Sequence, residues 1–206
     1  MHGKSGTLFQ NGTRLGKGSG KGRVAGFVCE HSILQGKFAP GNDFAPGKSM
    51  LSLLIVCIGN PLRCDDGFAS HVAKQLSRQS LPAGIQVVAV HQLAPEMSEL
   101  ASQAETVLFV DAARQGVPGS IKCQRIESDL GKFDSHRLSP EGVLALAQRL
   151  YSRCPSAYLL TVVGNSFGDG EGLSAPMTEQ LPTALAMIRD LIQNGEIPSN
   201  KKGQPD

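Results

Sequence analysis

Acidic and imidazole side chains occur where they could form a site. Two adjacent carboxylates, Asp65 and Asp66, follow an apolar run typical of a buried strand, and Asp111 directly follows a second such run. The carboxyl ends of parallel strands meet at one edge of an open α/β sheet, and ligands bind there. His136, in a polar segment further along the chain, adds an imidazole. Two carboxylates and an imidazole could hold a first-row divalent ion, so Asp66, Asp111 and His136 are candidate metal ligands.

Each of these residues also has an ordinary structural interpretation. A single aspartate after a strand often caps the next helix. A strand-terminal aspartate such as Asp111 can bind main-chain amides, and a loop histidine such as His136 is commonly a surface residue. We expect Asp65 to cap the following helix, which leaves Asp66 to face across the strand ends. Spacing alone leaves both the metal site and these structural roles open.

Neighbouring residues add further candidates. Cys64 could be a nucleophile, but carboxylates beside it would raise the pKa of its thiol and disfavour a reactive thiolate. His91 could be another ligand or a substrate contact, although an ordinary loop histidine is the simpler interpretation. Asp169 and Glu171 lie in a glycine-rich segment, which predicts a mobile, solvated rim.

The apolar pattern predicts the elements that position these residues. Strands are expected at 51–58, 85–90, 106–110, 121–126 and 158–163, and helices after Asp65, at 96–103, from Ser139 and from Ser174, with Pro182 expected to kink the last helix or mark a late start. The alternation in 121–126 indicates an edge strand or an antiparallel hairpin arm, and 127–138 is expected to be a polar loop. This order predicts a three-layer α/β fold with a mostly parallel, twisted sheet of about five strands between helices.

Residues 1–49 differ in composition from the rest of the chain. They hold 11 of the 24 glycines and seven of the 20 Lys and Arg residues, but only two of the 18 acidic residues. Their apolar residues follow no sustained period, so burial cannot easily offset the entropy cost of ordering. We therefore predict that 1–49 is a disordered leader or a mis-assigned start upstream of Met50. The domain is expected to span 50–195, followed by a polar tail at 196–206.

Charge and composition exclude several classes. The leader carries about +5 and the remainder about −3, so the overall +2 gives no reason to expect a nucleic-acid partner. Neither a secretory signal nor a membrane span is apparent in the sequence. The five cysteines lack CxxC spacing, and an odd number is poor evidence for a disulfide framework. A reducing cytoplasm is the simplest expected location.

Three motifs resemble the signature regions of the hydrogenase maturation proteases. They are IGNPLRCDDG at 58–67, VDA at 110–112 and SHRL at 135–138, and the resemblance covers about 50–194. These endopeptidases trim the C-terminal extension of the large subunit of NiFe hydrogenases. The segment His91–Glu96 looks like the corresponding loop of members that serve NAD-linked, bidirectional-type hydrogenases.

The resemblance implies a function and a set of site residues. The family's metal-binding trio carries over to Asp66, Asp111 and His136, although many members have Glu at the first position, one methylene longer than Asp66. The implied enzyme is a peptidase that recognises nickel already inserted in the large-subunit precursor and cleaves just beyond the precursor's last nickel-ligating cysteine. It should be idle on a precursor without nickel. The family fold, a twisted five-stranded sheet between helices, agrees with the pattern above.

Other mechanisms and functions remain to be weighed. Asp65 could act as a general base, and the lack of an HExxH helix argues against an ordinary zinc protease. A non-catalytic nickel-binding chaperone or sensor could use the same trio. A nucleotide-binding module is disfavoured, because the loop at Gly59 lacks the glycines that cradle pyrophosphate and a doubled acid would repel it. The expected partner is the hydrogenase large-subunit precursor, bound by a monomer with no nucleic-acid or membrane partner.

Overall fold

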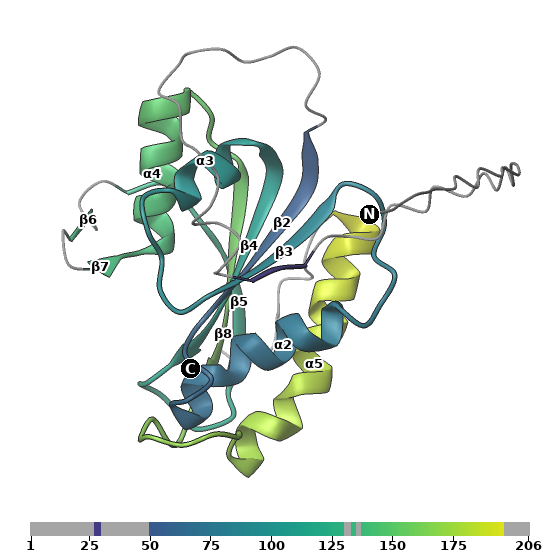
Figure 1. Ribbon diagram of the computed structural model, residues 1–206, viewed down its shortest axis with the longest axis vertical. Coiled ribbons are helices and arrows are strands. Elements are labelled where there is room, and N and C mark those ends of the chain that lie inside the picture. Colours follow the sequence, from purple (N-terminus) through teal and green to yellow (C-terminus); the bar gives the residue numbers. More distant parts are fainter. Residues whose placement is uncertain (1–26, 30–49, 130–132, 135–136, 196–206) are drawn as a thin grey trace, which may run out of the picture.

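The protein has a three-layer α/β fold with a central six-stranded sheet (Figure 1). The computed structural model describes residues 27–29, 50–129, 133–134 and 137–195. Across the sheet the strands are β1 (Phe27–Cys29), β3 (Ile85–Val90), β2 (Leu51–Ile58), β4 (Ala104–Ala113), β8 (Ser156–Val163) and β5 (Ile121–Ile126). The first five are parallel, and β5 pairs antiparallel with β8 at the edge. The predicted fold class and the predicted edge strand are both confirmed.

Helices cover both faces of the sheet. They are η1 (Cys64–Gly67, a 3-10 turn), α2 (Phe68–Leu76), α3 (Met97–Ser102), α4 (Pro140–Tyr151) and α5 (Ala175–Asn194). The helices α2 and α5 lie together on one face, and α3 and α4 lie together on the other (Figure 1). Connections between parallel strands cross over a face of the sheet. Here the crossover from β2 to β3 through α2 uses one face, and those through α3 and α4 use the other.

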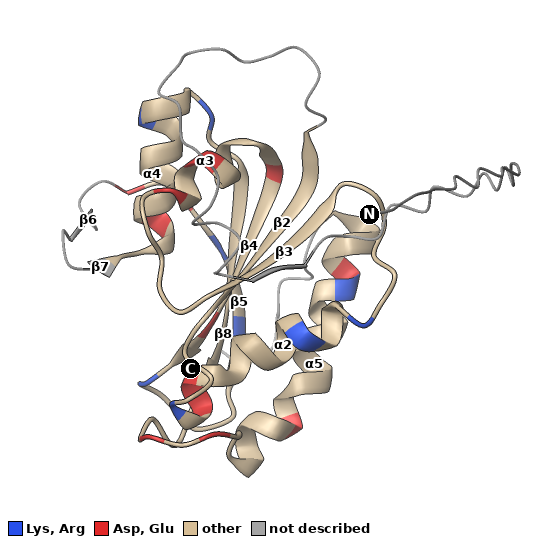
Figure 2. Ribbon diagram, in the orientation of Figure 1, with Lys and Arg blue, Asp and Glu red and all other residues tan. Residues whose placement is uncertain are grey.

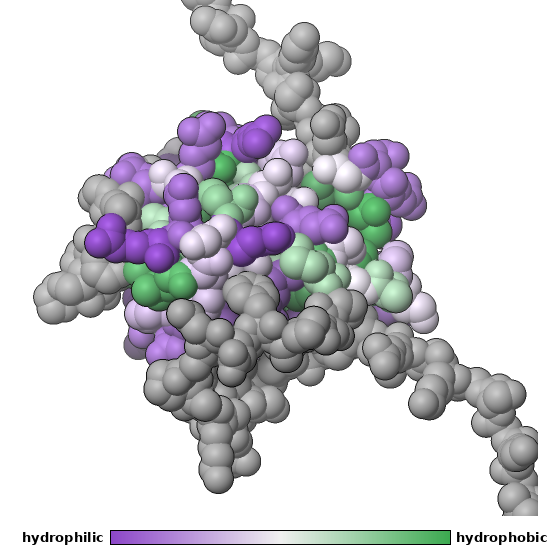
Figure 3. Space-filling view, turned by 90° about the horizontal axis from the view of Figure 1, so that it is seen from above, coloured by the Kyte–Doolittle hydropathy of each residue, from purple (hydrophilic) through white to green (hydrophobic). Residues whose placement is uncertain are grey.

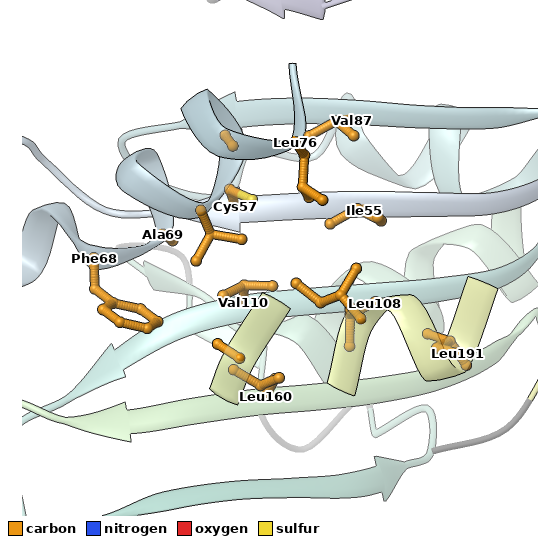
Figure 4. Close-up of a cluster of buried hydrophobic side chains, with 14 of the residues drawn as sticks. Ile55, Cys57, Phe68, Ala69, Leu76, Val87, Leu108, Val110, Leu160 and Leu191 are labelled. Carbon is orange, nitrogen blue, oxygen red and sulfur yellow. The ribbon is translucent and has the colours of Figure 1, made fainter. Parts of the chain in front are cut away.

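The hydrophobic core is split by the sheet into two halves. Alternate residues of β2 face opposite sides, with Ile55 and Cys57 toward α2 and α5, and Leu54 and Val56 toward α3 and α4. Figure 4 shows side chains of α2 and α5 meeting those of β2, β4 and β8 in the first half. Burial of a large side chain such as Phe68 contributes roughly 1.5–3 kcal/mol. The near-continuous apolar run of β2 is thus the signature of a strand covered on both faces.

The starts of two helices follow the sequence signals. Ser139 caps α4 as predicted, because its hydroxyl oxygen accepts a hydrogen bond from the Gly142 amide at 3.1 Å. The helix α5 begins at Ala175, directly after Ser174 as predicted, and it continues through Pro182, so the alternative of a late start at Pro182 is wrong. Pro182 is exposed and so is Thr178, whose carbonyl loses its helical donor and can meet water instead.

Three segments differ from the predicted boundaries. The strand β4 continues beyond residue 110, because residues 111–113 keep their pairing with residues 161–163 of β8. The segment 127–138 is not entirely loop, since β6 (Phe133–Asp134) and β7 (Arg137–Leu138) form a small antiparallel pair. From 1–49, β1 pairs parallel with β3 and adds the sixth strand. The rest of 1–49 and the tail at 196–206 lie outside the described residues, so the predicted domain boundaries stay predictions.

Figure 3 shows mostly hydrophilic residues on the described surface seen from above, with hydrophobic residues in small separate groups. Within the described ranges, no helix combines the length and the apolar character needed to cross a bilayer.

Candidate functional site

The two predicted acids lie at the point where the strand order reverses. The chain passes from β2 to β3 on one side and then returns to β4 on the other side of β2. The carboxyl ends of β2 and β4 therefore form a topological switch point, the usual ligand position in such sheets. Asp66 reaches this edge through η1, which lies against β4, and Asp111 lies near the end of β4 itself. The sequence correctly predicted that both acids share this edge.

Asp66 is held by the main chain of its own loop. Its Oδ2 accepts a hydrogen bond from the Asn60 amide at 2.9 Å, and the Asp66 amide donates to the Arg63 carbonyl at 3.2 Å. The side chain is partly buried, and its Oδ1 accepts no hydrogen bond from the described part of the chain. A carboxylate fixed through one oxygen and open at the other is oriented to receive a cation.

Gly59 makes this loop possible. Its φ is +142°, and a Cβ there would overlap the carbonyl oxygen of Asp66. Only glycine combines this backbone conformation with so close an approach. The end of β2 is therefore built around the position of Asp66.

Asp111 lies inside β4, not after the strand as predicted. Its Cα is the register partner of Thr161 on β8, and its Oδ1 accepts a hydrogen bond from the Ala112 amide at 2.8 Å. The alternation along β4 puts Asp111 on the same side as Val107 and Phe109, which pack toward α3 and α4. The sheet thus fixes the position of this partly buried carboxylate.

The third predicted ligand, His136, lies outside the described residues. It falls between β6 and β7 in the sequence, and Leu138 of β7 packs on the core half of α3 and α4, the side that Asp111 faces. Among the described residues, no three His, Cys, Asp or Glu side chains gather as a metal site would require. Asp66 and Asp111 thus share one edge of the sheet, and the metal site of Asp66, Asp111 and His136 stays a prediction.

Asp65 does not cap the helix, and this prediction is wrong. The N-cap of α2 is Gly67, without a side-chain hydrogen bond. Asp65 instead points away and is fully buried. Its Oδ2 accepts from the amides of Asn165 at 2.7 Å and Ser166 at 2.8 Å and from the Ser174 hydroxyl at 2.8 Å, and its Oδ1 accepts from the Ser174 amide at 2.7 Å. We call these four interactions the Asp65 clasp.

The clasp also determines the charge of Asp65. Burial raises the pKa of this carboxyl, but the hydrogen bonds from Ser174, Asn165 and Ser166 favour the ionised form and bring the net pKa below its ordinary value. Asp65 is therefore a carboxylate at neutral pH. With 0 % of the residue exposed, it is poorly placed to take a proton from water, which argues against the hypothesis of a general base.

The other residues that the sequence analysis named as candidates lie in loops around the two acids. Cys64 has a φ of +50°, and its amide donates to the Gly170 carbonyl at 2.8 Å. His91 is exposed directly after β3, at the same sheet edge. Asp169 and Glu171 are exposed as predicted, but the loop that carries them is hydrogen-bonded to the first motif near both ends and at Gly170.

Sequence reasoning missed the aromatic and basic part of this edge. The Arg114 guanidinium lies over the Phe167 ring at 4.5 Å, and Arg63 Nη2 donates to the Phe167 carbonyl at 3.5 Å. Figure 2 shows that acidic segments gather at the lower end of the molecule, in η1, at the end of β4 and in the loop after β8. In the sequence, the signal for a polar site at this edge was the second aspartate of the first motif, because a helix cap needs only one acid.

Solved structures share the fold of this chain. The hydrogenase maturating endopeptidase HybD from Escherichia coli superposes with a TM-score of 0.60 at 21% identity, over 69% of this chain and 93% of that chain. The NiFe hydrogenase maturation protease HycI from Thermococcus kodakarensis KOD1 gives 0.58 at 21% identity, over 71% and 96%. This chain has the fold of the hydrogenase maturation proteases. The fold that the three motifs implied is thereby confirmed.

Structural similarity at this level of sequence identity establishes the fold alone. Neither a protein-family model nor a curated protein matches the sequence.

Proposed function

We propose that this protein is an endopeptidase that removes the C-terminal extension of a NiFe-hydrogenase large-subunit precursor after nickel insertion. The observation that carries the proposal is the pair of carboxylates, Asp66 and Asp111, at the switch point of a fold shared with hydrogenase maturation proteases. The three sequence motifs fall at this edge or in the segment leading to α4. The fold and the motifs support the same activity.

In this proposal nickel belongs to the substrate. Asp66, Asp111 and His136 would contact it, and this mixed oxygen and nitrogen donor set suits a first-row divalent ion. The open Oδ1 of Asp66 supports the assignment, because its Oδ2 is already held by Asn60. The bound ion would supply a positive docking point that a precursor without nickel lacks.

The residues of the chain itself orient the substrate. Two carboxylates, Asp66 in η1 and Asp111 in β4, create a negative potential that attracts a cation to the switch point. The Asn60 amide keeps Asp66 in one orientation, and the pairing of β4 with β8 does the same for the backbone of Asp111. Such fixed positions support the proposal, because a nickel ion held there would bring the precursor's C-terminal segment beside the site in one orientation.

We further propose that the protein acts in the cytoplasm, as a monomer without nucleic-acid or membrane partners. Cys57, Cys64, Cys123 and Cys154 are all free thiols, which supports a reducing compartment.

The proposal is tested by cleavage of purified precursor. Nickel-loaded and nickel-free precursor are incubated with the protein, and intact mass detects loss of the C-terminal peptide. We expect cleavage of the nickel-loaded form only. Asp66→Asn should abolish it, whereas Asp169→Asn, an exposed acid in the loop after β8, should cleave at nearly the wild-type rate.

Two outcomes would contradict the proposal. One is an uncleaved nickel-loaded precursor in the presence of folded protein, verified by circular dichroism. The other is wild-type cleavage by Asp66→Asn. Loss of nickel-dependent precursor binding in Asp66→Asn, with no cleavage by either protein, would instead identify a nickel-binding chaperone or sensor.

A further inference from the structure

The proposed function assigns no task to Asp65, although this residue accepts four hydrogen bonds beside the candidate site. We propose that Asp65 is a positioning residue: its clasp fixes the glycine-rich loop 164–174 against the loop 59–66, so that loop 164–174 forms a wall of the site and Asp66 stays at the switch point. The kinetic part of this inference rests on the proposed function, and its structural part does not.

One carboxylate closes the glycine-rich loop across its base. Asn165 and Ser166 stand at the start of the loop and Ser174 at its end, and all three donate to Asp65. Asp65 is fully buried and the four bonds are part-buried, so the carboxylate relies on these donors in place of water. The two ends of the loop are therefore tied to a residue next to Asp66.

The middle of the glycine-rich loop is tied to the same segment. The Cys64 amide donates to the Gly170 carbonyl at 2.8 Å, and the Gly170 amide donates to the Leu62 carbonyl at 2.9 Å. These bonds form a parallel bridge between Arg63 and Gly170. The Asp65 amide adds a bond to the Ser166 carbonyl at 2.9 Å. The two loops thus behave as one unit.

Close packing at Gly164 explains how the loops approach so closely. A Cβ at Gly164 would lie 2.6 Å from Phe167 Cζ and 2.9 Å from Asp65 Cβ, which is too close for any other residue. Phe167 is also held by Arg114 over its ring and by Arg63 at its carbonyl. The Phe167 ring therefore has a fixed position in the wall, beside the buried Asp65 carboxylate.

The clasp reaches Asp66 through one short turn. Asp65 and Asp66 are consecutive residues of η1, so a rotation that released Asp65 would also turn Asp66. That rotation would strain the bond from the Asn60 amide to Asp66 Oδ2. An amide at residue 65 has one acceptor oxygen where the carboxylate has two, so it cannot satisfy all four donors.

The experiment compares Asp65→Asn with Val88→Ala, a core substitution in β3 that lowers stability away from the clasp. Amide hydrogen exchange is measured by NMR at residues 165, 166 and 174, nickel affinity by calorimetry, and kcat and KM on nickel-loaded precursor. Ser174→Ala, which removes only the hydroxyl donor, is the milder second variant. Asp65→Glu tests rescue by a longer carboxylate.

We expect Asp65→Asn to accelerate exchange at the three amides by about tenfold or more, while amides of β2 and β4 stay protected. Nickel affinity should fall about tenfold and kcat/KM more than in Val88→Ala. Ser174→Ala should show the same changes at smaller size and decides the question if Asp65→Asn does not fold. Asp65→Glu should recover part of the activity.

Two results would overturn the inference. One is wild-type exchange at residues 165, 166 and 174 in the folded variants. The other is faster exchange with nickel affinity and kcat/KM no lower than in Val88→Ala, which would make the clasp purely structural. If wild-type protein cleaves no precursor, the proposed function fails, while exchange and nickel affinity still decide the role of Asp65.

Discussion

Asp65 and Asp66 are neighbours in one 3-10 turn, yet they lie in opposite surroundings. Asp65 is fully buried and accepts four hydrogen bonds from the loop after β8. Asp66 is partly buried and is held by one main-chain amide, and its Oδ1 accepts no hydrogen bond from the described residues. A buried charge must have its hydrogen bonds satisfied within the protein, whereas a charge kept partly unsatisfied is available for a ligand.

This difference explains why the loop carries two consecutive aspartates. Consecutive residues of a tight helical turn point in different directions, so one aspartate can turn inward while the next faces the sheet edge. The inward residue ties down the loops and the outward residue is left for the substrate. The largest expected effects of substitution therefore differ in kind between the two positions.

Gly59→Ala should have the largest effect, because it destroys the turn that places both aspartates. A Cβ would overlap the Asp66 carbonyl at a φ of +142°, and we expect a loss of about 4 kcal/mol or failure to fold. Urea denaturation measures the change. Gly172→Ala is the matched control, since its φ of +97° carries the same kind of strain with nothing within 4 Å, and about 1 kcal/mol is expected there. Equal losses would refute the steric argument.

Substitution of each aspartate by asparagine tests whether Asp65 stabilises the fold while Asp66 is left for a ligand. Asp65→Asn should lower the free energy of unfolding by about 3 kcal/mol, because buried donors lose a charged acceptor. Asp66→Asn should change it by less than about 1 kcal/mol, because the variant loses one partly exposed interaction. Both values come from urea titrations at pH 7. A larger loss at Asp66 than at Asp65 would reverse the assignment of the two roles.

Gly164→Ala should disturb the Asp65 side alone. The added methyl group would press on Phe167 and on the Asp65 Cβ, and overpacking of this kind costs about 2 kcal/mol. Gly168→Ala, four residues further along the same loop, has nothing within 4 Å and should stay within about 0.5 kcal/mol of wild type. Thermal denaturation separates the two variants. Similar melting temperatures would show that the loop accommodates the methyl group.

Phe167→Leu should have the smallest effect. It keeps an apolar side chain and removes the contact of the Arg114 guanidinium with the ring, which is worth about 0.5–1 kcal/mol at an exposed site. Combining it with Arg114→Ala in a double-mutant cycle measures the coupling between the two side chains. Additive effects would show that the ring contact does not help to hold the wall.

Much of the fold follows from local sequence signals. A few neighbouring residues are enough to predict three features: the buried strand β2 from its apolar run, the edge strand β5 from its alternation, and the start of α4 from Ser139. The extension of β4 to Ala113 could not be predicted, because it depends on pairing with β8 far along the chain.

The candidate site, like the fold, has one part that the sequence predicts and another that it does not. Asp66 and Asp111 were predictable because strand ends share an edge, and that is a rule of the fold. The clasp was not predictable, because Asp65 and its partner Asn165 are separated by 100 positions and no local pattern links them. The role of Ser174 was obscured as well, since it precedes α5 as a capping serine would but donates its hydroxyl to Asp65.

Anomalous diffraction at the nickel edge, from crystals soaked in a nickel salt, tests the central claim most directly, because it locates the ion without reference to activity. The account predicts one principal peak at the carboxyl ends of β2 and β4, in contact with Asp66 and Asp111 and completed by His136, and loss of that peak in Asp66→Asn. A map with no peak at this edge, or with nickel bound only at other groups such as the exposed Cys154, would contradict it.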